Sequence, residues 1–235
     1  GADIILTYQG EALKKRIVPL SEKANAKDIF ECDVSNEQSI ENTFDEIYKK
    51  YGKIDFIVHA IAYSDKEELK GKYIETSKKN FLQSMHISCY SFTAVANYAS
   101  KIMNDGGSML TLSYYGAEKV IPHYNVMGVA KAALEASVMY LSADLGDRAI
   151  RVNGISAGPV KTLAASGIGD FRYILKWNEY NAPLKRNTNL NDVGGAALFL
   201  LSNLSSGTTG EILHVDSGYH VVGMKSPDAP DISVV

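Results

Sequence analysis

The 235-residue chain has little of what marks several other classes of protein. It contains only two cysteines, Cys32 and Cys89, and both are isolated, which argues against a disulfide framework or a cysteine metal site. We expect both to be buried, reduced thiols in a cytoplasmic compartment. The net charge of −3 gives no reason to expect nucleic acid as a partner. No apolar run approaches the ~20 residues of a transmembrane helix, and no signal peptide opens the sequence.

Two kinds of binding motif are missing as well. No metal site is expected, because metal-ligand spacing is absent among the five histidines, His59, His86, His123, His214 and His220. The G-x-G-x-x-G phosphate loop of dinucleotide-binding proteins is also absent. Residues 167–169 read Gly-Ile-Gly, but no predicted strand precedes them closely and no third glycine follows.

What the sequence does contain is a regular alternation of short apolar runs and longer amphipathic stretches. Strands are predicted at residues 3–8, 28–32, 54–58, 108–112, 150–155 and 211–215. Helices are predicted at residues 11–24, 36–51, 76–103, 124–145, 170–180 and 192–201. The alternation predicts an α/β fold, a Rossmann-type doubly wound parallel sheet with flanking helices, in a single domain over residues 1–235. The tail 225–235, with two prolines, is expected to be an extended surface arm.

The ends of one helix carry recognisable signals. Ser35 is predicted to cap the helix 36–51, with Gln38 three residues later completing a capping box. Gly52 is predicted to end it as a left-handed residue.

Ligands of such folds bind beyond the carboxyl edge of the sheet, so the residues that follow each strand are candidates for a site. The first two strands are followed by Gln9 and by Asp33-Val34. The next three are followed by residues 60–62, by residues 113–116 and by residues 157–162. Taken singly each signal is weak, but together they predict one crevice.

Tyr124 and Lys131 are the strongest candidates for chemistry. They lie seven residues apart on a predicted helix, about two turns, and so share a face. A lysine ammonium near a phenol favours the phenolate and would lower the pKa of Tyr124, so the pair could stabilise or protonate an oxyanion. Spacing alone leaves another interpretation open, in which Tyr124 is a core aromatic and Lys131 a solvated surface charge.

The residues around this pair decide between the two interpretations. The segment Tyr114 to Lys131 resembles the short-chain dehydrogenase superfamily, and within it the enoyl-acyl-carrier-protein reductases of bacterial type II fatty acid synthesis. Ordinary members of the superfamily place the lysine four residues after the tyrosine. Here the spacing is Tyr-x6-Lys with an earlier Tyr114, as in the enoyl reductase branch. Residues 7–10, 32–34, 151–167 and 214–218 also resemble that branch, so the likeness covers nearly the whole chain.

The resemblance implies a role for each matching residue. Tyr124 would hydrogen-bond the thioester carbonyl of a trans-2-enoyl substrate, Tyr114 would line the acyl pocket beside it, and Ser64 matches a substrate-proximal position. Lys131 would bind the nicotinamide ribose. The adenosine half of the cofactor would contact Gln9, Asp33 and Val34, and the nicotinamide half would contact Ile61, Val160, Lys161, Thr162, Leu163 and Ala164. Residues 162–180 would form a lid over the cofactor and the acyl chain.

Cofactor and partners follow from the same resemblance. Gln9-Gly10 places no cation where a 2′-phosphate would lie, which favours NADH over NADPH, although Lys14-Lys15-Arg16 two turns later weakens that inference. The partner would be an acyl carrier protein bearing enoyl chains. A homotetramer is expected, with the helices 76–103 and 124–145 and the final strand as candidate interfaces.

The sequence departs from the family in one respect. Family members carry a strand, a glycine-rich loop and a helix upstream of the segment that starts here. We therefore expect an N-terminally incomplete chain in which the strands flanking the missing one lack a partner. Two alternative functions stay open: a 3-ketoacyl thioester or other carbonyl reductase of the same superfamily, and a non-catalytic dinucleotide-binding protein.

Overall fold

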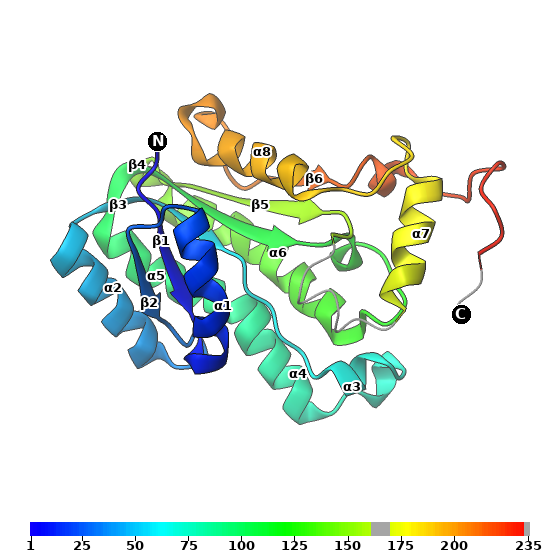
Figure 1. The fold of residues 1–235 in the computed structure, drawn as a ribbon, viewed down its shortest axis with the longest axis horizontal. Helices are drawn as coiled ribbons and strands as arrows, with labels where there is room; N and C mark the ends of the chain where they lie inside the picture. The colour runs from blue at the N-terminus through cyan, green and yellow to red at the C-terminus, as the bar shows by residue number, and fades with distance from the viewer. Residues whose placement is uncertain (161–169, 233–235) are drawn as a thin grey trace.

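Six parallel strands form the centre of the molecule, for which a computed structural model describes residues 1–160 and 170–232. They are β1 (Ile5–Tyr8), β2 (Asp28–Glu31), β3 (Ile54–His59), β4 (Met103–Ser113), β5 (Arg151–Ala157) and β6 (Ile212–Val215). β1 pairs with β2, and β3 to β6 pair in chain order as a second, four-stranded group (Figure 1). No pairing joins β1 to β3 within the described ranges.

All but one of the predicted helices are present with small changes of boundary. The longer helices are α1 (Gly10–Lys23), α2 (Glu37–Tyr51), α4 (Lys78–Met85), α5 (Ser91–Ile102), α6 (Asn125–Leu145), α7 (Phe171–Asn181) and α8 (Leu190–Leu201). A short helix that the sequence did not predict, α3 (Lys66–Leu69), follows β3. The described part of the tail, residues 225–232, has no helix or strand.

The prediction of one uninterrupted helix over residues 76–103 was wrong. A π-helical turn, His86–Tyr90, separates α4 from α5, and the chain enters β4 already at Met103. Directly after this turn, Ser91 Oγ donates to Ile87 O at 2.7 Å and also lies 2.8 Å from His59 Nε2. The side-chain bond to a preceding carbonyl and the link to β3 compete with regular helical pairing, which no local sequence signal reveals.

The cap of α2 was also placed one residue too early. Asn36, not Ser35, is the N-cap, because its side chain accepts hydrogen bonds from the N–H groups of Gln38 and Ser39. Ser35 instead donates its hydroxyl to Asp33 at 2.7 Å. Gly52 ends the helix at a positive φ of 75°, as predicted, although its ψ of −137° lies outside the left-handed helical region.

Helices cover both faces of the four-stranded group, and the side chains of its central strands alternate between them. Met109 and Val152 face a large core shared with α2, α5 and α6. Leu110 and Ile155 point the other way and pack with Leu200 of α8. Figure 1 shows α8 on one side of β4 and β5, with α5 and α6 on the other. This arrangement confirms the doubly wound α/β prediction.

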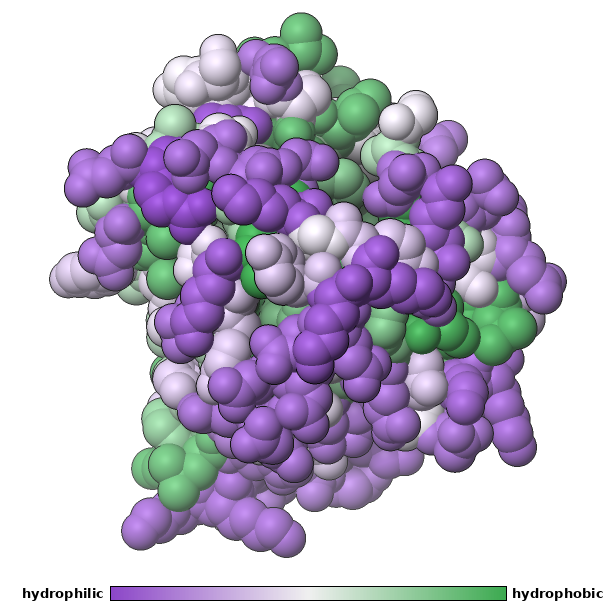
Figure 2. All heavy atoms as spheres, turned by 90° about the vertical axis from the view of Figure 1, so that its left-hand side faces the viewer, coloured by the Kyte–Doolittle hydropathy of each residue, from purple (hydrophilic) through white to green (hydrophobic). Residues whose placement is uncertain are grey.

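The outer surface beside this core is largely polar. On the side that carries α2, hydrophilic side chains cover most of the visible face (Figure 2). Within the described residues one helix, Asn125–Arg148, is long and apolar enough to cross a membrane by length and composition. Its fully buried Val126, Ala130, Leu134 and Val138 recur every four residues and pack inside the protein, which accounts for its composition. Cys32 and Cys89 are buried and free, as predicted.

Candidate active site

A cavity of about 550 Å³ opens at the carboxyl ends of β3, β4 and β5, where the arrows of β4 and β5 point toward α7 (Figure 1). Its wall is mostly apolar, with two lysines and a few hydroxyl groups. The lining residues are Ala60, Ile61, Ala62, Tyr63, Ser64, Lys66, Leu69, Leu112, Ser113, Tyr114, Tyr124, Met127, Lys131, Ala157, Gly158, Pro159, Val160, Phe171, Leu190 and Val193. Of the five strand ends that were expected to converge on one crevice, three line this cavity, those of β3, β4 and β5.

The fold brings one group of predicted site residues together here. Those that line the cavity are Ile61, Ser64, Tyr114, Tyr124, Lys131 and Val160. Lys161, Thr162, Leu163 and Ala164 lie outside the described residues, as does the first part of the predicted lid 162–180. Phe171, in the described part of that segment, contributes to the wall.

The residues predicted for the adenosine half lie apart from this cavity, at the ends of β1 and β2. Gln9 Nε2 donates to Asp33 Oδ2 at 3.4 Å. Burial opposes ionisation of Asp33, yet hydrogen bonds from the hydroxyl and N–H of Ser35 hold its pKa below the usual range. Val34 is buried in the main core. An ionised carboxylate at this strand end is the group that accepts hydrogen bonds from ribose hydroxyls in dinucleotide-binding folds.

The backbone around Tyr124 is strained and well anchored. Tyr124 is the N-cap residue of α6 rather than its first helical residue, and its neighbours His123 and Asn125 have positive φ values of 58° and 41°. Asn125 Nδ2 donates to the carbonyls of Leu69 and Gly71, at 3.2 and 2.9 Å. His123 Nε2 lies 3.0 Å from Asp170 Oδ2, at the start of α7. Such strain persists only where the surroundings fix it, which is common at active sites.

Two glycines leave room for the Tyr124 ring. A Cβ on Gly116 would lie 2.3 Å from Tyr124 Cδ1, and one on Gly128 would lie 2.6 Å from the Gly116 carbonyl oxygen. Tyr114 packs edge-on against Tyr124, with ring centroids 5.0 Å apart. The segment 114–131, singled out in the sequence as one motif, therefore acts as one structural unit around the Tyr124 phenol.

The predicted effect of Lys131 on Tyr124 was wrong for the protein alone. Burial, with a smaller contribution from Tyr114, raises the pKa of Tyr124 well above its usual range, and burial likewise raises that of Tyr114. Tyr124 is thus a neutral phenol. This state is an O–H donor, which can hydrogen-bond a carbonyl oxygen and stabilise the charge that develops there.

Lys131 is buried, and its ammonium is fixed by the backbone of β4. Its Nζ donates to Leu112 O at 2.7 Å. Burial lowers its pKa to about 8, while nearby Cys89 and Glu135 act in the opposite direction. The interpretation of Lys131 as a solvated surface charge is therefore excluded.

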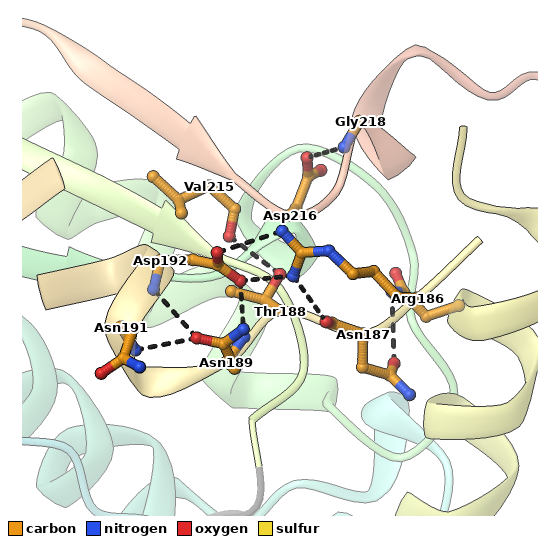
Figure 3. Close-up of polar contacts among 10 residues, drawn as sticks. Arg186, Asn187, Thr188, Asn189, Asn191, Asp192, Val215, Asp216 and Gly218 are labelled. Carbon is orange, nitrogen blue, oxygen red and sulfur yellow. Dashed lines mark hydrogen bonds and ion pairs between the residues drawn. The ribbon is translucent and has the colours of Figure 1, made fainter. Parts of the chain in front are cut away.

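Polar contacts order the loop between α7 and α8 (Figure 3). Arg186 makes two hydrogen bonds to the Asp192 carboxylate, at 2.5 and 3.0 Å, and Thr188 Oγ1 donates to Val215 O at 3.1 Å. A Cβ on Gly158 would lie 2.4 Å from Thr188 Oγ1, so this loop packs directly on the end of β5.

Several cavity residues carried no signal in the sequence. Met127, one turn after Tyr124, and Lys66 and Leu69 of α3 all line the wall, together with Leu190 and Val193 from the first turn of α8. Met127 and Val193 lie in predicted helices with nothing to set them apart, whereas Lys66, Leu69 and Leu190 lie outside every predicted element. Tertiary packing alone brings all five to the site.

His59, at the end of β3, is buried between the hydroxyl groups of Thr111 and Ser91, and its protonation can be tested. Its ring nitrogens lie 3.1 Å from Thr111 Oγ1 and 2.8 Å from Ser91 Oγ, and burial lowers its pKa to about 3. The pKa of a histidine in the unfolded chain is near 6.5. Between about pH 3 and that value the unfolded chain binds a proton that the native protein does not, so the free energy of unfolding rises with pH. Above that window His59 no longer changes the stability. From pH 7 to pH 5 this group should cost about 2 kcal/mol.

The measurement is the free energy of urea unfolding at both pH values for the wild type and for His59→Gln. The variant should lose less stability between pH 7 and pH 5 than the wild type by about that amount. Equal losses would show that His59 is protonated in the native protein.

The cavity suits a nicotinamide cofactor in its donors and its shape. An ammonium has three donors, and within the described residues Lys131 uses one of them on Leu112 O, which leaves two for a pair of ribose hydroxyls. Ala60, Ala62, Ala157 and Gly158 are small residues in the same wall, which lets a planar ring approach the backbone. A parallel α/β sheet with a buried Tyr/Lys pair beyond its carboxyl edge defines a Rossmann-type oxidoreductase.

Comparison with known proteins identifies the group within this class. Residues 1–220 match the family described as Enoyl-(Acyl carrier protein) reductase. The enoyl-[acyl-carrier-protein] reductase [NADH] 1 of Rhizobium meliloti is 68% identical over 235 residues, 100% of this chain and 86% of that protein. The chain belongs to the enoyl-acyl-carrier-protein reductase family.

Solved structures agree with this assignment. The enoyl-acyl-carrier-protein reductase of Anaplasma phagocytophilum, in complex with NAD, has a TM-score of 0.93 and 63% identity, covering 99% of this chain and 86% of that one. The enzyme of Bacillus cereus, with NADP+ and an indole naphthyridinone, has a TM-score of 0.92 and 48% identity, covering 95% and 88%.

Proposed function

We propose that this chain reduces the trans-2 double bond of enoyl thioesters carried by an acyl carrier protein, with NADH as the reductant. This is the last reductive step of the fatty acid elongation cycle. The observation that supports it best is the position of Tyr124 and Lys131 in one largely apolar cavity beside Tyr114. An apolar wall suits an acyl chain, and the two polar groups suit a thioester carbonyl and a ribose.

Tyr124 is assigned to the thioester carbonyl. NADH, when bound, supplies the hydride that reaches the β carbon of the substrate. The neutral Tyr124 phenol donates a hydrogen bond to the carbonyl oxygen, and this bond strengthens as negative charge develops there. The enolate, hydrogen-bonded to Tyr124, then takes up a proton from water at its α carbon, which leaves hydroxide to be neutralised by the buffer, and Tyr124 keeps its own proton. Tyr114, edge-on to Tyr124, limits the directions that the phenol can take, and Ser64 lies in the same wall.

Lys131 is assigned to the nicotinamide ribose and to charge stabilisation. Its attachment to Leu112 O holds the ammonium at the base of the cavity, where its positive charge favours an anion at the carbonyl oxygen. Ile61 and Val160 are assigned to the nicotinamide, and Gln9, Asp33 and Val34 to the adenosine half. Residues 161–164 are assigned to the cofactor and residues 162–180 to a lid from the family resemblance.

A comparison of thioester substrates tests the function. NADH oxidation is followed with a crotonyl thioester and, separately, with a 3-ketoacyl thioester. Turnover of the enoyl substrate alone supports the proposal. Turnover of the ketone alone would identify a carbonyl reductase, and tight NADH binding without turnover of either would identify a non-catalytic dinucleotide-binding protein.

The residues at the ends of β1 and β2 predict a preference for NADH over NADPH. Lys14, on α1, lies 5.8 Å from the ring centroid of Tyr8 at the end of β1, and it pairs with Glu11 at 3.2 Å. A 2′-phosphate beside Gln9 and the ionised Asp33 would therefore lack a dedicated partner, and a missing charged hydrogen bond costs about tenfold or more. We expect kcat/KM for NADH to exceed that for NADPH by at least this factor, and equal values would contradict the assignment.

We propose a cytoplasmic homotetramer that receives its substrate from an acyl carrier protein. Exposed apolar side chains on α6, Met139 at 55% and Tyr140 at 75%, support burial of this helix against another subunit.

A further inference from the structure

Glu135 is a half-buried carboxylate one helical turn after Lys131. Both side chains bind residues at the carboxyl end of β4. Lys131 Nζ donates to the carbonyl of Leu112, and Ser113, the next residue, donates its hydroxyl to Glu135 Oε1. Residues four apart on a helix are side-chain neighbours. Two successive residues at the end of β4 are therefore bound by two α6 side chains of opposite charge, one helical turn apart.

The sheet extends this contact as a row of polar side chains. In register with Ser113 stand Ser156 of β5 and His214 of β6, so the three lie side by side on the face opposite Leu112 and Ile155. Ser156 Oγ is buried with no hydrogen-bond partner in the described part of the chain. His214 Nε2 lies 2.6 Å from Glu118 Oε1, after the Tyr115–Ala117 turn. Glu135 thus lies at one end of a polar layer on the α6 face of the sheet, next to Lys131.

We propose that Glu135 is a positioning residue for the reaction: its ionised carboxylate keeps the buried Lys131 protonated and holds α6 in register with the end of β4. The proposal rests on the proposed function in assigning Lys131 to the cofactor ribose. Neither the family resemblance nor any sequence motif pointed to Glu135. It is a residue acting through Lys131 rather than one that touches substrate.

Burial opposes the charge on both Lys131 and Glu135, so the charge of each side chain is stabilised by the charge of the other. Burial lowers the pKa of Lys131 to about 8, and Glu135 is one of two groups that raise it. Burial also raises the pKa of Glu135, and the Ser113 hydrogen bond, His214 and Lys131 lower it while Glu118 raises it. An ammonium with a pKa so near neutrality loses protonation readily when a neighbouring negative charge is removed.

The titratable groups that face this pair come from every element packed on it. Tyr124 lies on the same side of α6, Glu118 follows the turn before it, and His214 faces it from β6. On the Lys131 side stand Cys89 of the π-helical turn and His59 of β3. Burial raises the pKa of Tyr124 and Cys89 and lowers that of His59, so these three are neutral near pH 8. Glu135 is therefore the charged group best placed to hold the Lys131 proton.

The direct test is the titration of Lys131 itself. In protein labelled with ¹³C at lysine Cε, the Lys131 resonance is assigned by its loss in Lys131→Met and followed through the basic range by NMR. The expected midpoint is near 8 in the wild type. In Glu135→Gln it should fall by about one pH unit, the shift typical of one nearby charge. Glutamine can still accept the Ser113 hydrogen bond, so the variant removes charge while keeping the contact.

Two further variants separate charge from structure. Glu135→Asp keeps the charge and should leave the midpoint near that of the wild type. Asp144→Asn removes an exposed carboxylate farther along α6 and should leave it unchanged. The basic limb of kcat/KM should move to lower pH in Glu135→Gln alone.

The outcomes for the two proposals are distinct. A Lys131 midpoint that is the same in Glu135→Gln and in the wild type would overturn the role of Glu135, whatever the activity. Failure of the wild type to turn over an enoyl thioester would instead count against the proposed function, while the NMR midpoints would still decide the inference.

Discussion

Replacement of Tyr124 by phenylalanine should lower kcat for an enoyl thioester by about 10² to 10³-fold, the usual cost of removing one oxyanion donor. The ring would still fill the space left by Gly116 and Gly128 and pack against Tyr114, so the cavity should keep its shape. Only the hydroxyl is lost. Because the hydrogen bond strengthens as charge develops on the carbonyl oxygen, the loss should fall on kcat rather than on substrate affinity.

The measurement is steady-state turnover of a crotonyl thioester, set beside the NADH dissociation constant from fluorescence titration. The dissociation constant should stay close to that of the wild type, since the ribose is assigned to Lys131. Tyr114→Phe is the matched control, because it removes a neighbouring phenol that packs on Tyr124 without an assigned bond to the carbonyl. If Tyr124→Phe retains wild-type turnover, the assignment of the oxyanion donor is wrong.

Replacement of Gly128 by alanine should destabilise the protein by about 1–3 kcal/mol, the typical cost of overpacking. Alanine is normally the better helix residue by up to about 1 kcal/mol, so the sign of the effect is itself informative. The new Cβ would lie 2.6 Å from the backbone oxygen of Gly116. A carbonyl in the main chain cannot turn away as a side chain can, so α6 must shift from the turn that follows β4.

The free energy of unfolding in urea measures this effect, and the chain offers a matched control. Gly194 is in α8 with nothing within 4 Å of the position of a Cβ. Gly194→Ala should therefore stabilise the protein by roughly 0.5–1 kcal/mol. Gly128→Ala should also lower turnover, since the same shift moves Tyr124. A stabilised, fully active Gly128→Ala variant would contradict the close packing of α6 against Gly116.

The predicted elements depended on signals that are local in the chain. Apolar runs of strand length and amphipathic stretches of helical period place every strand and nearly every helix, because both patterns are fixed by which side chains must leave water. The exceptions have non-local causes. The π-helical turn His86–Tyr90 is followed by Ser91, whose hydroxyl bonds the carbonyl of Ile87 and contacts His59 of β3. The helix α3 is too short to carry a period.

Only part of the candidate site could likewise be predicted from the sequence. Tyr114, Tyr124 and Lys131 lie within one 18-residue segment, and their spacing and neighbours sufficed to single them out. Met127, Leu190 and Val193 could not be found, because only the packing of α6 and α8 on the sheet brings them to the cavity. The sequence predicted a lowered pKa for Tyr124, whereas burial raises it. Proximity to a lysine is visible in the sequence, and burial is not.

By itself, then, the sequence determined the α/β class, the crevice at the carboxyl ends of the strands, and the Tyr124 and Lys131 pair. The tertiary structure alone decided which groups surround that pair. It placed Tyr124 out of water as a neutral donor and brought Gly116 against Gly128. It also set Glu135 beside Ser113, from another element, next to the buried ammonium. The physical reason is that the pKa of a side chain is set by its burial and by the charges around it. Both depend on residues that are far apart in the chain.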